Sequence, residues 1–171
     1  MGNVSSKDIE YKIYTLGDIG VIELLISYRY KYDDYLFARE SSIAVVNGVL
    51  PINDEMVLTY VSLDEYIKRC KFDILQMRMI KLIEHGYSYE EISSLTGVHL
   101  SAVKGRMKTI YKRIAKENEW QWKKSIYVDK LELRTKQCSK CKEDLPATVE
   151  FYSNLKKTKD GFHSQCRKCK V

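Results

Sequence analysis

Proline and glycine are scarce in this sequence, and long apolar runs are absent. Two prolines and eight glycines among 171 residues exclude long disordered linkers rich in these residues. No stretch of eighteen apolar residues exists, so no membrane-spanning helix and no membrane partner are expected. Residues 1–7 lack the basic and then apolar layout of a secretion signal. With 44% apolar and 30% charged residues, the composition is typical of a soluble globular protein.

Histidine is also rare, and no familiar arrangement of catalytic residues is present. An HNH nuclease site needs two histidines and an asparagine around a metal ion, and His85, His99 and His163 do not stand in such a pattern. The chain has no phosphate-binding P-loop, no GxSxG nucleophile motif and no paired acidic cluster. We therefore expect a protein that is not an enzyme.

The net charge of +6 is distributed unevenly along the chain. Residues 1–60 hold five Lys and Arg against nine Asp and Glu, whereas residues 61–118 hold eleven against seven and residues 119–171 hold thirteen against seven. The acidic first third is a poor phosphate binder, and the two basic parts are suitable ones. This asymmetry suggests nucleic acid at one end and a different partner at the other, although a basic surface can also serve solubility alone.

Residues 1–60 form an acidic, tyrosine-rich region that we expect to be helical. Apolar residues between positions 17 and 39 roughly follow one helical face, and Asn47-Gly48 indicates a turn after them. Six tyrosines lie between positions 11 and 35. Tyrosine is favoured at protein interfaces, so this region either contacts RNA polymerase or another protein, or its tyrosines fill a helical core.

Capping patterns divide residues 61–118 into helices. Ser62 followed by Glu65 is a capping box, which predicts one long helix over residues 63–85 that ends at Gly86. Ser88 followed by Glu91 is a second capping box and predicts a short helix to about residue 95. Residues 96–98 form a tight turn, and a third helix is expected over residues 100–118.

The third helix has an apolar stripe on one face and lysines on another. The stripe is formed by Val103, Met107, Ile110 and Ile114, and Arg106 and Arg113 lie beside the lysines. Two capped helices joined by a glycine turn are typical of a helix-turn-helix, whose second helix presents its N-terminal side chains to the major groove. The residues expected to contact double-stranded DNA are Ser101, Ala102, Lys104, Gly105, Lys108 and Lys112.

Residues 74–114 resemble region 4 of bacterial sigma factors. The resemblance covers about 40 of the 171 residues and rests on Gly86-Tyr87-Ser88, Glu91-Ile92, Leu95, Gly97, Val103-Lys104 and Met107. It implies a DNA-reading helix-turn-helix like that of small phage late-gene activators. LuxR-type regulators and some terminase small subunits share similar helices. The sequence departs from the pattern at His99, where a good helix cap is usual, and no sigma region 2 is recognisable. A three-helix bundle with no DNA role remains the alternative.

Four of the five cysteines form two CxxC pairs, Cys138 with Cys141 and Cys166 with Cys169. Each pair can form a tight knuckle that directs two thiolates at one tetrahedral centre, so we expect these four residues to bind Zn²⁺. Iron–sulfur and redox sites fit the spacing less well, and His163 could replace one cysteine. Between the pairs, Asp160-Gly161 predicts a hairpin turn. Cys70 stands alone and is expected to be a small buried residue.

The stretch that holds the two pairs also resembles the four-cysteine finger found beside HNH nuclease domains in phage proteins, over about 32 residues. In combination, the patterns predict a mainly α protein with a helix-turn-helix domain and a small zinc-ribbon or treble-clef-like module. The expected regions are 1–60, an acidic helical part; 61–118, the helix-turn-helix; 119–136, a connector; and 137–171, the zinc module.

The favoured function is a phage or prophage transcription regulator that binds specific DNA sequences in the bacterial cytoplasm. Two alternatives use the same sequence features. A DNA-recognition subunit for packaging or recombination would use the same helices, and a protein that binds host RNA polymerase would need no DNA site.

Overall fold

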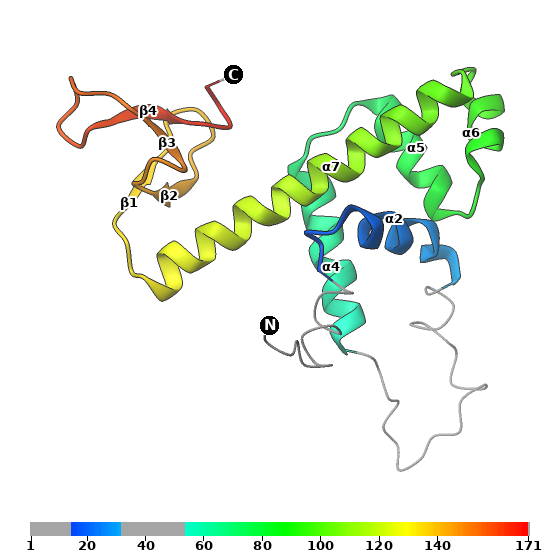
Figure 1. Ribbon diagram of the computed structural model, residues 1–171, viewed down its shortest axis with the longest axis horizontal. Helices are drawn as coiled ribbons and strands as arrows, with labels where there is room; N and C mark the ends of the chain where they lie inside the picture. Colours follow the sequence, from blue (N-terminus) through cyan, green and yellow to red (C-terminus); the bar gives the residue numbers. More distant parts are fainter. Residues whose placement is uncertain (1–14, 32–53, 171) are drawn as a thin grey trace, which may run out of the picture. The chain divides into compact units, whose positions relative to one another are not determined.

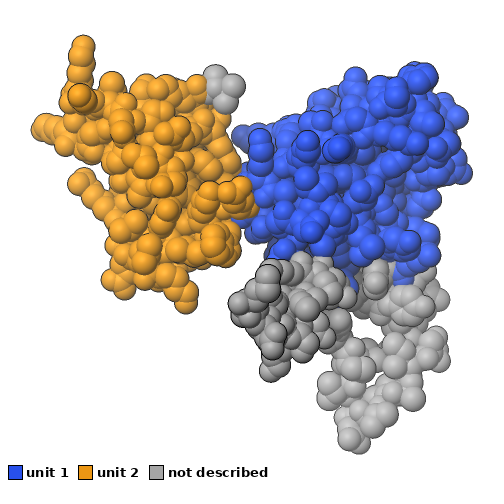
Figure 2. All heavy atoms as spheres, in the orientation of Figure 1, with its two compact units in different colours: residues 1–118 blue, residues 119–171 orange. Residues whose placement is uncertain are grey.

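The computed structural model describes residues 15–31 and 54–170, which fall into two compact units divided between residues 118 and 119 (Figures 1 and 2). Unit 1 is helical, and unit 2 holds short strands around the cysteine pairs. The protein is therefore mainly α with a small cysteine module at its C-terminal end, as the sequence predicts. No helix within the described residues is both long and apolar enough to cross a membrane.

The first helix in the described part of unit 1 is α2 (Ile19–Ser27), and the Asp18 side chain caps its N-terminus by accepting a hydrogen bond from the Gly20 amide. Ile22, Leu25 and Ile26 of α2 are buried in the same core as residues from the later helices. The sequence predicts one or two helices in this region, and in the described part α2 ends at Ser27 while residues 29–31 are again helical. Residues 32–53, which include the Asn47-Gly48 turn, lie outside the described residues.

The predicted single helix over residues 63–85 is wrong, because two helices occupy this part of the chain. They are α4 (Asp54–Arg69) and α5 (Ile74–Glu84). Lys71 adopts a left-handed backbone with φ of 47°, which interrupts the helical hydrogen bonds. The Asp73 side chain then caps the Gln76 amide at 2.7 Å, while the Gln76 side chain accepts from the Asp73 amide. Ser62, which the sequence predicts to be a helix cap, lies inside α4.

The second capping box is confirmed. The Ser88 side chain caps the N-terminus of α6 (Tyr89–Thr96), and the Glu91 carboxylate accepts a hydrogen bond from the Ser88 amide at 2.8 Å. Gly86 before this helix and Gly97 after it have φ values of 87° and 68°. Both values lie in the left-handed region that glycine tolerates best, so the two turns form where the sequence predicts them.

The third helix, α7 (Leu100–Ser125), begins as predicted but extends beyond the expected end at residue 118. No glycine or proline occurs between positions 106 and 145, and Lys123 pairs with Glu119 one turn earlier at 2.6 Å. A π-helical turn, η1 (Ile126–Lys130), follows. Much of the segment expected to be a connector is therefore helical.

The core of unit 1 forms around the apolar stripe of α7. All four predicted stripe residues, Val103, Met107, Ile110 and Ile114, have no exposed surface. They join buried residues of α2, α4, α5 and α6 in one cluster, which includes Ile92. The Arg29 guanidinium links three segments of this unit, because it bonds the Asp64 carboxylate of α4 and the buried Glu84 of α5.

Unit 2 contains two antiparallel hairpins. In the first, β1 (Thr135–Gln137) pairs with β2 (Asp144–Pro146), and in the second β3 (Tyr152–Asn154) pairs with β4 (Phe162–Cys166). The predicted Asp160-Gly161 turn lies within the β3–β4 connection, with Gly161 at φ 76°. The hydrophobic core of unit 2 consists of Cys138, Leu145, Phe151, Tyr152 and Cys166. Pro146 is also buried, and the Trp120 ring packs edge-on against Phe151.

Candidate functional site: a basic helix face and a four-cysteine cluster

The N-terminal half of α7 presents a continuous exposed surface opposite its buried stripe. Every residue predicted to contact DNA lies on this exposed side: Ser101, Ala102, Lys104, Gly105, Lys108 and Lys112. Ile92 anchors the preceding helix α6 in the core, and the Ser93 hydroxyl donates to the Val98 carbonyl at 2.7 Å. The turn between α6 and α7 is thereby held in place, with α6 beside the start of α7 (Figure 1).

The start of α7 uses His99 where a Ser or Asp cap is common. The Ser101 amide donates to His99 Nδ1 at 3.3 Å, and the same nitrogen lies 2.8 Å from the Ser101 hydroxyl. The imidazole thus contacts the first turn of the helix and engages the hydroxyl of a residue predicted to contact DNA. This arrangement compensates for the weak capping that the sequence indicates at this position.

The lysines on the exposed face of α7 differ in their surroundings. Lys104 lies 3.7 Å from the Glu90 carboxylate of α6, but both side chains are more than half exposed, so the attraction is weak. Lys108 and Lys112 have no ion-pair partner within the described part of the chain. Their ammonium groups are therefore available to an external anion.

Arg113 does not belong to this basic face, contrary to the sequence interpretation. Its guanidinium stacks 4.5 Å from the centre of the Phe72 ring and donates to the Gln76 side chain and the Cys70 carbonyl. It therefore joins α7 to the turn between α4 and α5. Arginine suits this role because its planar group can stack and donate several hydrogen bonds at once. The sequence contains no signal that separates Arg113 from its exposed neighbour Lys112.

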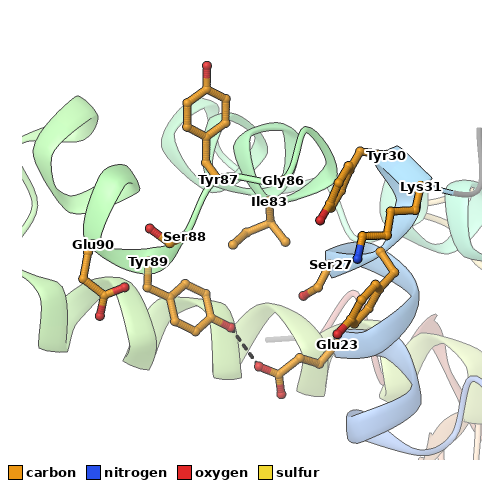
Figure 3. Close-up of a pocket in the computed structure, with 11 residues that line it drawn as sticks. Glu23, Ser27, Tyr30, Lys31, Ile83, Gly86, Tyr87, Ser88, Tyr89 and Glu90 are labelled. Carbon is orange, nitrogen blue, oxygen red and sulfur yellow. Dashed lines mark hydrogen bonds between the residues drawn. The ribbon is translucent and has the colours of Figure 1, made fainter.

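A hollow of about 400 Å³ lies between α2 and the α5–α6 turn (Figure 3). The Tyr89 hydroxyl donates to the Glu23 carboxylate at 2.9 Å and lies 3.2 Å from the Tyr111 hydroxyl, so three helices meet here. Burial raises the pKa of Tyr111 far above its usual range, and its hydroxyl stays protonated. Glu23, Glu90 and Lys31 all line the hollow, so its charged groups are of both signs.

The four cysteines of the CxxC pairs meet in unit 2. The sulfur atoms of Cys138, Cys141, Cys166 and Cys169 all lie within 4.8 Å of one another. Within the described residues, no other group of three or more His, Cys, Asp or Glu side chains is placed to hold a metal ion. Cys138 and Cys166 are buried and Cys141 is exposed, so the cluster lies at the edge of the module.

Backbone amides stabilise the Cys138 thiolate. Burial alone would raise the pKa of this thiol, but N–H groups from Cys166, Cys141 and Lys140 point at its sulfur and lower the pKa to about 6. The lysines and arginines around the pairs mostly contact other groups. Lys140 donates to the Cys169 carbonyl, Arg167 donates to the Val149 carbonyl, and Lys168 lies 4.5 Å from the centre of the Trp120 ring.

The spacing of the four sulfur atoms is compatible with tetrahedral coordination of one metal ion. A zinc–sulfur distance of about 2.3 Å places tetrahedral sulfur atoms about 3.8 Å apart. The Cys141 and Cys166 sulfur atoms are 4.0 Å apart, close to this separation. His163 is not part of the cluster, and its Nδ1 accepts a hydrogen bond from the Gln165 amide. The cluster could therefore hold a metal ion with four sulfur ligands.

Comparison with known proteins gives one short similarity. Over 34 residues the chain is 53% identical to the Bacillus subtilis protein named "SPbeta prophage-derived putative HNH endonuclease YoqL". The matched stretch is 20% of this chain and 15% of that relative, so the chain spans only a small part of the relative's length. No family model matches the chain, and no solved structure matches it.

Proposed function

We propose that this protein is a sequence-specific DNA-binding regulator of transcription, of phage or prophage origin, that acts in the bacterial cytoplasm. The observation that carries the proposal is the paired arrangement of α6 and α7. A short capped helix holds a second helix whose exposed N-terminal half bears Lys104, Lys108 and Lys112 opposite a fully buried stripe. This is the arrangement that a helix needs in order to enter the major groove.

The individual contacts follow from the chemistry of the exposed side chains. Lys104 and Lys108 would donate to phosphates or to guanine edges, and Ser101 can donate or accept. Lys112 is further from the N-terminus of α7 and would contact the backbone phosphates. Residues 1–60 would contact a protein partner such as RNA polymerase, although the structure describes only part of that region.

We propose that the four cysteines bind Zn²⁺ and that the metal has a structural role. When bound, the ion would link the knuckle at Cys138 and Cys141 to the knuckle at Cys166 and Cys169. The buried core of unit 2 consists of only five residues, and so small a core needs a metal or a similar crosslink for stability. The short prophage relative is consistent with this module, because the sequence of residues 138–169 resembles fingers that accompany HNH domains.

The name of the prophage relative favours nuclease activity as a second candidate. The described histidines do not support it: His85 contacts the Lys81 carbonyl, His99 contacts Ser101, and His163 contacts Gln165. We therefore propose that the chain binds DNA without cleaving it. Incubation of the zinc-loaded protein with plasmid DNA and Mg²⁺ or Mn²⁺ should leave the plasmid intact. Site-dependent cleavage of the plasmid would contradict our proposal and show that the protein is a nuclease.

The experiment that tests the main proposal is a selection of genome fragments by the purified zinc-loaded protein at two salt concentrations. We expect enrichment of a short motif upstream of genes that persists at the higher salt. Lys104→Ala with Lys108→Ala should weaken binding to the motif at least tenfold, since one lost base contact is worth about 1–3 kcal/mol. Binding without any preferred sequence, or no effect of the double variant, would overturn it. A ring-shaped oligomer on DNA would favour the packaging alternative.

A further inference from the structure

The turn between β3 and β4 in unit 2 contains three lysines, and none of them is adjacent in sequence to a cysteine of the cluster. Lys156, Lys157 and Lys159 are all exposed, and none of them forms an ion pair with another residue in the described parts of the chain. The turn therefore presents three positive charges to the solvent within four consecutive positions. No part of the proposed metal site or of the α7 surface accounts for them.

Hydrogen bonds within the turn fix its conformation. The Leu155 amide donates to the Gly161 carbonyl at 2.7 Å, and the Gly161 amide donates back to the Thr158 carbonyl at 3.1 Å. The Thr158 hydroxyl lies at hydrogen-bond distance from the carbonyls of Leu155 and Phe162. Because the backbone is held in this way, the lysines extend from a preformed base, which lowers the entropy lost when they bind a ligand.

The acidic residue of the turn, Asp160, is already neutralised from within unit 2. Its carboxylate pairs with Lys136 at 2.5 Å and accepts a hydrogen bond from the Phe162 amide. The Lys136 ammonium and this amide hold the pKa of Asp160 at about 2, well below its usual value. Asp160 thus remains an anion bound to Lys136, and its charge does not offset the three exposed lysines.

We infer that this turn, residues 155–161, is a second DNA-contacting surface that binds the phosphodiester backbone. The inference rests on the proposed function, because it assigns the turn to the same DNA. Three separate point charges on an open turn suit a row of phosphates better than a single phosphate, which needs convergent donors. Lysine ammonium groups lack the planar fork that reads base edges, so the turn would add affinity and not sequence preference.

The test compares two double variants of the full zinc-loaded chain that remove the same charge. The turn variant carries Lys156→Gln and Lys159→Gln. The control variant carries Lys68→Gln, in the last turn of α4, and Lys71→Gln, two residues after that helix, and both of these lysines are exposed in unit 1. Binding to a duplex of random sequence is measured by fluorescence anisotropy from low to moderate salt. The zinc content of each variant, expected at one ion per chain, checks that unit 2 is folded.

We expect the turn variant to reduce the slope of log K against log salt by about 1 to 2, since each phosphate contact contributes about 0.9. The control variant should change the slope by much less. Equal slopes for the turn variant and the native chain would overturn the inference while leaving the proposed function intact. If the native chain binds no duplex even at low salt, the proposed function itself fails. Slopes that fall equally in both variants would indicate a general charge effect and would also overturn the inference.

Discussion

Individual side chains determine how α7 divides into a packed face and a free one. Lys112 and Arg113 are neighbours with the same charge, but only Arg113 turns inward, where it stacks on Phe72 and bonds the Cys70 carbonyl. The two residues can be distinguished only when the α4–α5 turn is known, because that turn supplies the acceptors. The stripe from Val103 to Ile114, in contrast, follows from helical spacing alone.

Gly105 is the residue whose role is easiest to test, since the protein itself does not require a glycine there. A Cβ atom at this position would meet nothing within 4 Å, and the backbone is helical. Gly105→Ala should therefore stabilise the fold by roughly 0.5–1 kcal/mol in urea unfolding. If the backbone of α7 approaches DNA at this point, the same variant should bind the selected motif more weakly.

Gly86→Ala is the matched control for this prediction. Its φ of 87° is unfavourable for alanine, and the new methyl group would lie 3.1 Å from the Tyr30 ring. The free energy of unfolding should fall for Gly86→Ala and rise for Gly105→Ala. A loss of stability in Gly105→Ala would contradict the free α7 surface on which the DNA proposal depends.

At the scale of elements, most of the fold follows from local patterns. The Ser88 capping box and the left-handed glycines at 86 and 97 place α6 and its turns. The division between α4 and α5 was not predicted, although Asp73 and Gln76 form a capping box in the sequence. The capping patterns at Ser62 and at Asp73 predict different helix boundaries in this stretch. The left-handed backbone of Lys71 separates the two helices, and a lysine in the sequence does not indicate such a conformation.

The two competing caps lead to opposite expectations for alanine substitutions. Asp73→Ala removes the side chain that bonds the Gln76 amide and should lower the free energy of unfolding by about 1 kcal/mol. Ser62→Ala changes a residue inside α4 and should alter stability by less than about 0.5 kcal/mol, because alanine favours helix interiors. Thermal or urea unfolding of both variants measures the difference. A larger loss of stability for Ser62→Ala than for Asp73→Ala would contradict the division into α4 and α5 and favour the single helix over residues 63–85.

At the scale of the whole molecule, the two units have different sources of stability. Unit 1 buries a large apolar cluster drawn from α2 to α7, whereas the core of unit 2 consists of five residues, two of them cysteines. The cysteine spacing predicts that the four sulfur atoms meet, and Asp160-Gly161 predicts a hairpin turn. Both features are present in unit 2. The packing of Trp120 onto Phe151 was not foreseeable, because it depends on the continuation of α7 beyond residue 118.

This contrast predicts that removal of the metal unfolds unit 2 and spares unit 1. The chain has two tryptophans, so the substitution Trp122→Phe leaves Trp120 as the only one, and its fluorescence then reports on unit 2. The Trp122 side chain is 62% exposed, so its replacement should disturb the packing little. A zinc chelator should shift the Trp120 emission to longer wavelength as the ring leaves Phe151, and zinc should reverse the shift. Most of the helical circular dichroism and the main thermal transition should persist, because the core of unit 1 contains no cysteine of the cluster. An unchanged Trp120 emission would show that the module folds without metal, whereas an equal loss of helicity in unit 1 would show that the two units unfold together.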